Sequence, residues 1–146
     1  MNLSKNVKVT VVSPAATAAT TAIDSSVLDM TGFEGVMFIA LLGDVTSGSV
    51  LTLTPKSNTA NSTSSPTPTS HTGAAATFTA GASDADSKAL ITDLYKPLQQ
   101  YVFANLTRTT QNAVVGGIIA IQYSAGSRPT SHDASVIASG ILVPAA

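Results

Sequence analysis

The chain has 146 residues, of which 44% are apolar and only 10% are charged, and its formal net charge is −1 at pH 7. Its length suits one domain, and its apolar content is high enough to build a core, which excludes a disordered polymer. The seven basic residues are scattered, which argues against binding nucleic acid or a membrane surface through clustered Lys and Arg. The lack of cysteine excludes a disulfide framework and a thiol nucleophile.

No segment reaches the roughly 18 consecutive apolar residues that a transmembrane helix needs. The longest apolar runs, at residues 36–42 and 113–121, are too short, and glycines interrupt the second. The N-terminus lacks the continuous apolar stretch of a signal peptide. We therefore expect synthesis in a host cytoplasm.

Strand signals dominate the chain. Apolar residues never recur with helical spacing over three turns, whereas segments rich in Val, Ile and Thr alternate with Gly, Pro, Asn, Asp and Ser. In chain order we predict strands at residues 7–11, 21–29, 36–42, 50–54, 77–79, 89–94, 101–106 and 114–123. These eight strands, without any helix–strand alternation, predict an all-β fold that is an antiparallel β-sandwich or barrel.

Three local patterns sharpen this prediction. The continuous apolar run at 36–42 is typical of a strand buried on both faces. Two glycines in the loop at 43–48 are consistent with a hairpin to the next strand. Gly116 and Gly117, inside the longest strand, indicate a bulge or a close approach of two backbones.

Two segments fall outside the strand pattern. Residues 56–73 are rich in Ser, Thr, Asn and Pro and nearly devoid of apolar side chains, so we expect a flexible loop. Residues 134–146 form an apolar tail that a domain of eight strands cannot also cover. We expect a single domain over 1–146 with extended N- and C-terminal arms, the tail adding to a neighbour's sheet edge or lying along a shell.

Residue types that serve catalysis or metal binding occur close together twice. Asp84 and Asp86 could face one cation, but calcium takes about six to eight oxygens, so we interpret both as acceptors of backbone N–H bonds at a corner. Ser131, His132 and Asp133 have the types of a hydrolase triad, yet neighbouring side chains on an extended segment point to opposite sides. The sequence predicts no enzyme, no cofactor and no metal site.

Aromatic side chains are few, and we assign most of them to packing. Those at strand-like positions are predicted to lie in the core: Phe33, Phe38, Phe78 and Phe103. The tyrosines are predicted to lie at the edge of the core, with their polar tips available to an interface: Tyr95, Tyr101 and Tyr123.

Two blocks of sequence carry a family resemblance. The first is DMTGFEGVMFI at 29–39 with the glycine-flanked loop at 43–48, and the second is YKPLQQYVF at 95–103, followed by the apolar strand 114–123 and Arg128-Pro129. Together they cover about half of the chain and resemble the small decoration (cement, or head-stabilising) proteins of tailed bacteriophages. The resemblance implies a jelly-roll or related β-sandwich, oligomers on a capsid surface, and no catalysis.

We therefore expect a non-enzymatic virion protein that decorates and stabilises a phage capsid by binding between major capsid subunits. We expect a homo-oligomer, a dimer or trimer, whose many weak contacts act together without nucleic acid or membrane. The predicted contact residues come from both arms and from loop or strand ends: Asn2, Lys5, Lys8, Tyr101, Arg128, Ile137, Ile141 and Leu142. Two alternatives stay open, a carbohydrate- or receptor-binding module built on loop 56–73 and the Asp84/Asp86 turn, and a neck or tail-tube component.

Overall fold

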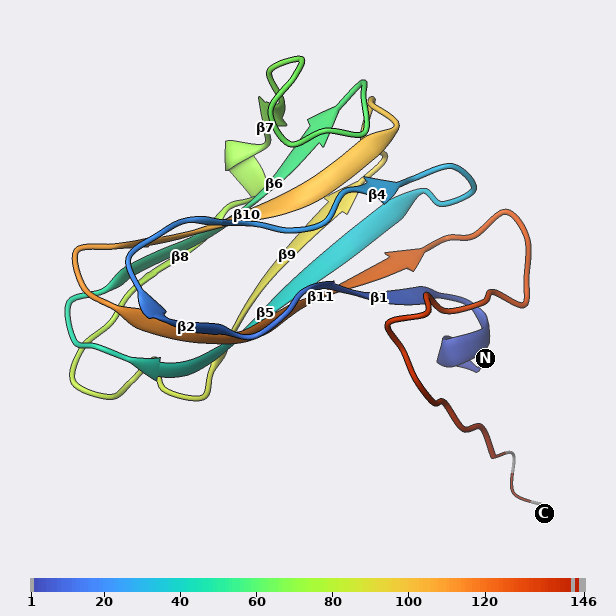
Figure 1. Cartoon of the computed structure of the whole chain (residues 1–146). Helices are drawn as coiled ribbons and strands as arrows, with labels where there is room; N and C mark the ends of the chain where they lie inside the picture. Colours follow the sequence, from blue (N-terminus) through green and yellow to red (C-terminus); the bar gives the residue numbers. More distant parts are fainter. Residues whose placement is uncertain (1, 143, 145–146) are drawn as a thin grey trace.

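The computed structural model describes residues 2–142 and 144, which build two antiparallel β-sheets packed face to face (Figure 1). Sheet A has the strand order β1 (Lys8–Ser13), β11 (Ala113–Tyr123), β5 (Gly35–Val45), β9 (Ala89–Tyr95), with β2 (Ala16–Ala19) also paired to β11. Sheet B has the order β3 (Ile23–Asp24), β10 (Tyr101–Thr109), β6 (Val50–Asn58), β7 (Thr69–Ser70), with β4 (Leu28–Asp29) on β10 and β8 (Ala76–Thr79) on β6. Two single-turn 3-10 helices complete the elements: η1 (Leu3–Lys5) and η2 (Thr72–Ala74).

The strand pairs are nested along the chain. The first strand, β1, pairs with the last, β11; β3 and β4 pair with β10; β5 pairs with β9; and β6 pairs with β8. The chain is therefore one long folded-back ribbon rolled so that successive pairs fall in alternate sheets, which is the jelly-roll arrangement. This confirms the predicted all-β, antiparallel, jelly-roll-like sandwich.

The turn after β5 crosses between the sheets. β5 belongs to sheet A and β6 to sheet B, so the hairpin predicted at 43–48 is wrong. Gly43 and Asp44 continue β5, and the chain reverses around Gly48, which has φ +90°. Crossing places the apolar sides of β5 and β6 face to face in the core, which a hairpin within one sheet cannot do.

The core lies between the sheets and draws on alternate residues of each strand. From β5 it takes Val36, Phe38, Ala40 and Leu42, which pack with the inward residues of β6 and β10. The residues between them, Met37, Ile39 and Leu41, point outward and are only partly covered. The prediction that 36–42 is buried on both faces is therefore wrong, because no second layer among the described residues covers the outer face of sheet A.

Most of the aromatic assignments to packing agree with the structure. Phe38 and Phe103 are fully buried, and Phe33 is partly buried against the core. Phe78 is 39% exposed, so its assignment to the core is wrong. It lies on the short strand β8 opposite the buried Leu51, so its ring is on the core side of sheet B but at the open edge of the sandwich, where solvent reaches it.

Three segments differ from the predicted strand pattern. Residues 16–19, to which the sequence assigned no strand, form β2, and the single strand predicted at 21–29 is the two short strands β3 and β4. The loop predicted at 56–73 is shorter, because 56–58 continue β6 and Thr69–Ser70 pair with it. The buried Asn58 amide donates to the carbonyls of Ser62 and Pro66, both at 2.9 Å, and holds the remainder in place. Flexibility of the loop stays a prediction.

The glycine pair in β11 marks a bulge, as predicted. The register with β5 shifts on both sides of Val115, and Gly117 has φ +141°. A Cβ on Gly117 would lie 3.2 Å from the Ser13 carbonyl oxygen of β1. The described part of the chain contains no helix long and apolar enough to cross a membrane.

Candidate interaction surfaces

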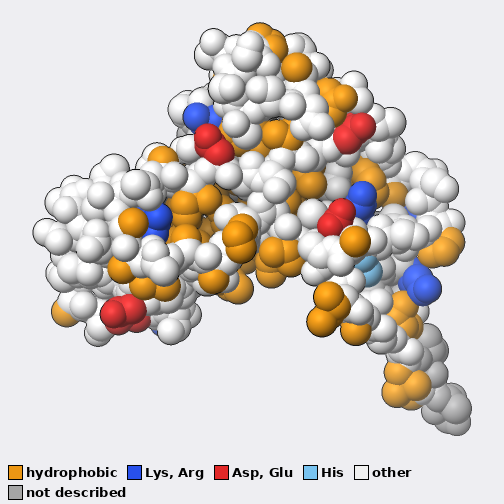
Figure 2. All heavy atoms as spheres, viewed as in Figure 1, with side chains coloured by type: hydrophobic (Ala, Val, Ile, Leu, Met, Phe, Trp, Pro, Cys, Tyr) orange, Lys and Arg blue, Asp and Glu red, His pale blue; other side chains and the backbone are white. Residues whose placement is uncertain are grey.

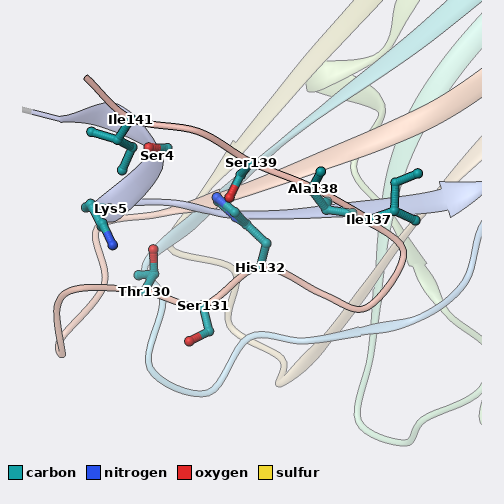
Figure 3. Close-up of a pocket in the computed structure, with 10 residues that line it drawn as sticks. Ser4, Lys5, Thr130, Ser131, His132, Ile137, Ala138, Ser139 and Ile141 are labelled. Carbon is teal, nitrogen blue, oxygen red and sulfur yellow. The ribbon is translucent and has the colours of Figure 1, made fainter.

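The structure brings four of the eight predicted contact residues to one corner, which we call the terminal corner. Lys5 ends η1, and its backbone N–H donates to the Asn2 carbonyl at 3.2 Å. The C-terminal segment passes beside this helix, so that Ile137 and Ile141 line a shallow hollow with Ser4 and Lys5 (Figure 3). Two segments at opposite ends of the sequence thus form one surface.

The other four predicted residues are spread out. Lys8 follows on β1, next to the terminal corner, and Leu142 continues the tail. Tyr101 is half-buried in sheet B, paired with Asp29 of β4 and Asn58 of β6. Arg128 lies in the exposed loop that follows β11, so neither Tyr101 nor Arg128 belongs to the corner.

Residues 130–135, here called the strap, cover the free edge of β1. Thr130 N–H donates to Lys5 O at 2.9 Å, and Asp133 N–H donates to Val9 O at 3.2 Å. Side chains complete the edge: Val9 N–H donates to His132 Nδ1 at 3.1 Å, and Val11 N–H donates to Ser135 Oγ at 2.9 Å. Because an uncovered edge strand invites pairing with another chain, the strap shields the hydrogen-bonding groups of β1.

The strap also accounts for the apparent triad. His132 is engaged with the backbone of β1, and the carboxylate of Asp133 accepts the Ser135 N–H at 2.9 Å. Bonds from Ser135 lower the pKa of Asp133 below its ordinary value. Both groups therefore hold the strap together or to β1, and in Figure 3 the Ser131 side chain points away from the His132 ring.

Beyond the strap, the apolar tail leaves the domain. Ile137 is 97% exposed and Leu142 is 81% exposed, while Ile141 keeps 43% of its surface open beside η1. In the view of Figure 2, hydrophobic side chains recur along this tail and gather in the middle of the molecule. The predicted tail includes Val143 and residues 145–146, which lie outside the described residues. The described part of the tail buries little apolar surface on its own domain.

Sequence reasoning missed a second surface, the outer side of sheet A, here called the apolar face. Strand register places its side chains in rows across β1, β11, β5 and β9. One row is Val11, Ile119, Ile39 and Ile91, and the next is Val9, Ile121, Met37 and Asp93. Leu41 and the tyrosines 95 and 123 extend the face at its two ends. The continuous apolar runs of β5 and β11 were the signal for it, since such runs are apolar on both sides.

Two stacked tyrosines close one end of the apolar face. The rings of Tyr95 on β9 and Tyr123 on β11 are parallel within 2°, with centroids 6.2 Å apart, and they flank Gly35 of β5. A Cβ on Gly35 would lie 2.3 Å from the Tyr123 ring, so the absence of a side chain there admits the ring. Burial, and donation to the Asp93 carboxylate, raise the pKa of Tyr123. Its hydroxyl therefore stays protonated and holds Asp93.

The acidic turn has a structural role, as predicted. Asp84 Oδ1 accepts the Gly81 N–H at 2.6 Å, and Asp86 Oδ1 accepts the Val45 N–H at 2.8 Å. Both carboxylates thereby fix the crossing between β8 and β9 and the end of β5. Across the residues that the structure describes, no three His, Cys, Asp or Glu side chains gather as metal ligands.

Comparisons with known proteins support the fold of this chain and do not assign it to a family. No family model matches the chain, and no curated protein matches it in sequence. Among solved structures, the crystal structure of PBSX exported protein XepA is similar, with a TM-score of 0.54 at 16% sequence identity. The match covers 100% of this chain and 45% of that chain, so this chain spans less than half of XepA.

Proposed function

We propose that this chain is a non-enzymatic structural protein of a bacteriophage particle, which decorates and stabilises the capsid by binding between major capsid subunits through its terminal corner. The observation that carries the proposal is the exposed apolar tail, anchored beside η1 by a strap of defined hydrogen bonds. An apolar segment held out from its own domain is suited to burial on another protein.

The phage setting rests on two supports. The blocks at 29–39 and 95–103 resemble the decoration proteins of tailed phages. The shared fold with PBSX exported protein XepA agrees with a phage context for such a domain. Jelly rolls are also common in viral capsid proteins, where they present loops and termini to neighbouring subunits.

The energetics favour many weak contacts. Full burial of Ile137 and Leu142 would contribute about 1.5–3 kcal/mol each, which is of the same order as the cost of immobilising a partner. A single copy would then bind weakly, and occupancy would depend on a supporting contact or on several linked copies. This is the regime expected for a protein that stabilises a symmetric shell.

The test mixes purified protein with undecorated phage shells and counts bound copies per shell by cryo-imaging across a concentration series. Wild type should saturate at a fixed number of copies. Ile137→Ser with Leu142→Ser should weaken binding at least about a hundredfold, because two apolar anchors are lost. Leu98→Ser is the matched control, since Leu98 is 101% exposed in a different loop and should bind as wild type does.

Three results would contradict the proposal. The first is the absence of saturable binding to shells. The second is undiminished binding by the double serine variant. The third is specific binding to glycans or to host cells without binding to shells, which would establish the receptor-binding alternative. Where shell binding is absent, as in the first result, rings seen by negative stain would favour the neck or tail-tube alternative.

A further inference from the structure

We infer that the apolar face of sheet A is the contact surface between two copies of this chain, packed sheet against sheet. This inference rests on the fold and on the outward side chains, and it stands whether or not the terminal corner binds a capsid. It assigns a partner, a second copy, to a surface that the proposed function leaves open.

The chemistry of the outward positions points to a protein layer above the sheet. In a sandwich, outward residues of an antiparallel sheet are ordinarily polar, because they face water. Here Ile91 is 53% exposed, and Val11 and Leu41 are 43% exposed each. These side chains belong to three different strands, β9, β1 and β5, so the exposed surface is contiguous across the sheet.

The main row of the face is self-complementary. Its order across the sheet is Val11, Ile119, Ile39 and Ile91, so every member is β-branched. A twofold axis along the strand direction would lay β1 over β9 and β11 over β5. Ile39 of one copy then meets Ile119 of the other, and Ile91 meets Val11, which is the self-matching that a twofold interface requires.

The size of the face is near that of a small dimer interface. Four strands about 4.8 Å apart and seven residues at about 3.4 Å per residue give a patch of roughly 20 by 20 Å, on the order of 400 Å² in projection. Two opposed patches approach the roughly 1,000 Å² that marks a specific interface. We therefore expect a reversible dimer with a dissociation constant in the micromolar range.

Charge on the face also favours a second copy over a charged ligand. Asp93 is the charged group set among the rows, and it lies on the edge strand β9, where it accepts a hydrogen bond from Tyr123 Oη. No Lys or Arg occupies an outward position in the rows of β1, β11, β5 and β9, all of which are described. One cation borders the face: Lys96 Nζ lies 5.4 Å from the centroid of the Tyr95 ring, at the tyrosine end. The rows themselves carry no cluster of basic groups that would bind phosphate, and their complement is another apolar surface.

The first test measures the mass of the full chain by sedimentation equilibrium from about 1 to 500 μM, a range that brackets a micromolar constant. Wild type should move from 14.7 kDa to twice that mass. A triple variant, Val11→Thr, Ile39→Thr and Ile91→Thr, keeps β-branched side chains and should dimerise at least about a hundredfold more weakly. Leu98→Thr should dimerise as wild type does. A wild-type monomer over the whole range, or a dimer unchanged in the triple variant, would overturn the inference.

The second test uses wild type alone, so it does not depend on a variant folding. Isoleucine methyl groups are labelled, and their NMR shifts are followed on dilution. The methyl groups of Ile39, Ile91 and Ile119 should shift with concentration, while the buried Ile118 stays constant. Shifts confined to the tail residues Ile137 and Ile141 would show that copies meet through the terminal corner and would refute the assignment of the face. Loss of shell binding in the triple variant, without any wild-type dimer, would assign the face to the shell.

Discussion

Arg108 on β10 is the side chain whose replacement should destabilise the fold most specifically. It is only 3% exposed, and its guanidinium donates to three backbone carbonyls: Thr17 at 2.8 Å, Thr21 at 2.9 Å and Ala113 at 2.7 Å. It therefore ties the chain that crosses from β2 to β3 onto both β10 and β11. Desolvation lowers the pKa of the Arg108 guanidinium from its ordinary value. The three carbonyl oxygens that accept its hydrogen bonds offset the cost of burying the charge.

The cost of replacing Arg108 by methionine follows from what each carbonyl can do afterwards. Thr17 and Thr21 are exposed, so their carbonyls can bond to water instead. Ala113 is fully buried, so its oxygen loses this partner without replacement, at about 1–3 kcal/mol. With the charge-assisted bonds to the two threonines, we expect Arg108→Met to lower the free energy of unfolding by about 2–4 kcal/mol, out of a total near 5–15 kcal/mol.

Urea unfolding monitored by circular dichroism measures this difference. With a slope of about 2 kcal/mol per molar urea, in the middle of the usual range, the midpoint should fall by about 1–2 M at an unchanged slope. The urea midpoint of Arg108→Lys should lie between those of wild type and Arg108→Met, because an ammonium keeps the charge but cannot bond three carbonyls in a planar fork. Arg128→Met is the control, since Arg128 is exposed, and it should change stability by less than about 0.5 kcal/mol. If Arg108→Met were as mild as that control, the assigned role of the guanidinium would be refuted.

Three further predictions concern the face and the strap. Gly35→Ala should expel the Tyr123 ring and weaken its near-ultraviolet circular dichroism, at a cost of about 1–3 kcal/mol; an unchanged tyrosine signal would contradict the packing. Gly117→Ala should destabilise the fold by a similar free energy and so lower the melting temperature, because a backbone φ of +141° is strained for any residue other than glycine. An unchanged melting temperature would count against the bulge. The lowered pKa of Asp133 means that its contribution to strap docking is complete above the ordinary Asp value near 3.9 and is lost as the pH falls through its lower folded value. Intrinsic-rate-corrected amide exchange at the covered edge of β1 should therefore rise in acid in wild type, whereas Asp133→Asn should exchange faster at neutral pH and show little further acid response.

Much of the fold could be predicted because period-two patterns are local. The strands at 36–42, 50–54, 89–94 and 101–106 all fall within strands of the structure, and the glycine pair in β11 marks a bulge. The interpretation of Asp84 and Asp86 as turn acceptors also needed only local chemistry, since each carboxylate accepts a backbone N–H. The short strands β2, β3 and β4 could not be predicted in the same way, because they hold four or fewer residues, too few to show an alternating pattern. Their pairing partners also lie far away in the sequence.

For the candidate surfaces too, local sequence indicated some features, and long-range contacts decided others. The tail was recognised from its composition, and half of the predicted contact residues meet at the terminal corner. That His132 and Ser135 cover the edge of β1 could not be foreseen, because the bonded residues lie more than 120 positions apart. Tyr101 is also among the predicted contact residues, and the fold places it in sheet B, away from the terminal corner.

The sequence by itself determined that the chain forms strands, that little charge covers them, and that apolar residues exceed what alternation in a two-layer sandwich requires. Only the tertiary structure decided where these additional apolar residues lie, because the sheet to which a strand belongs depends on its pairing with strands that are distant in the sequence. Once β5 crosses to sheet A, Phe38 enters the core and Ile39 is left on the outside. The same nesting buries Arg108 among carbonyls that are distant in the sequence, and no local pattern encodes that outcome.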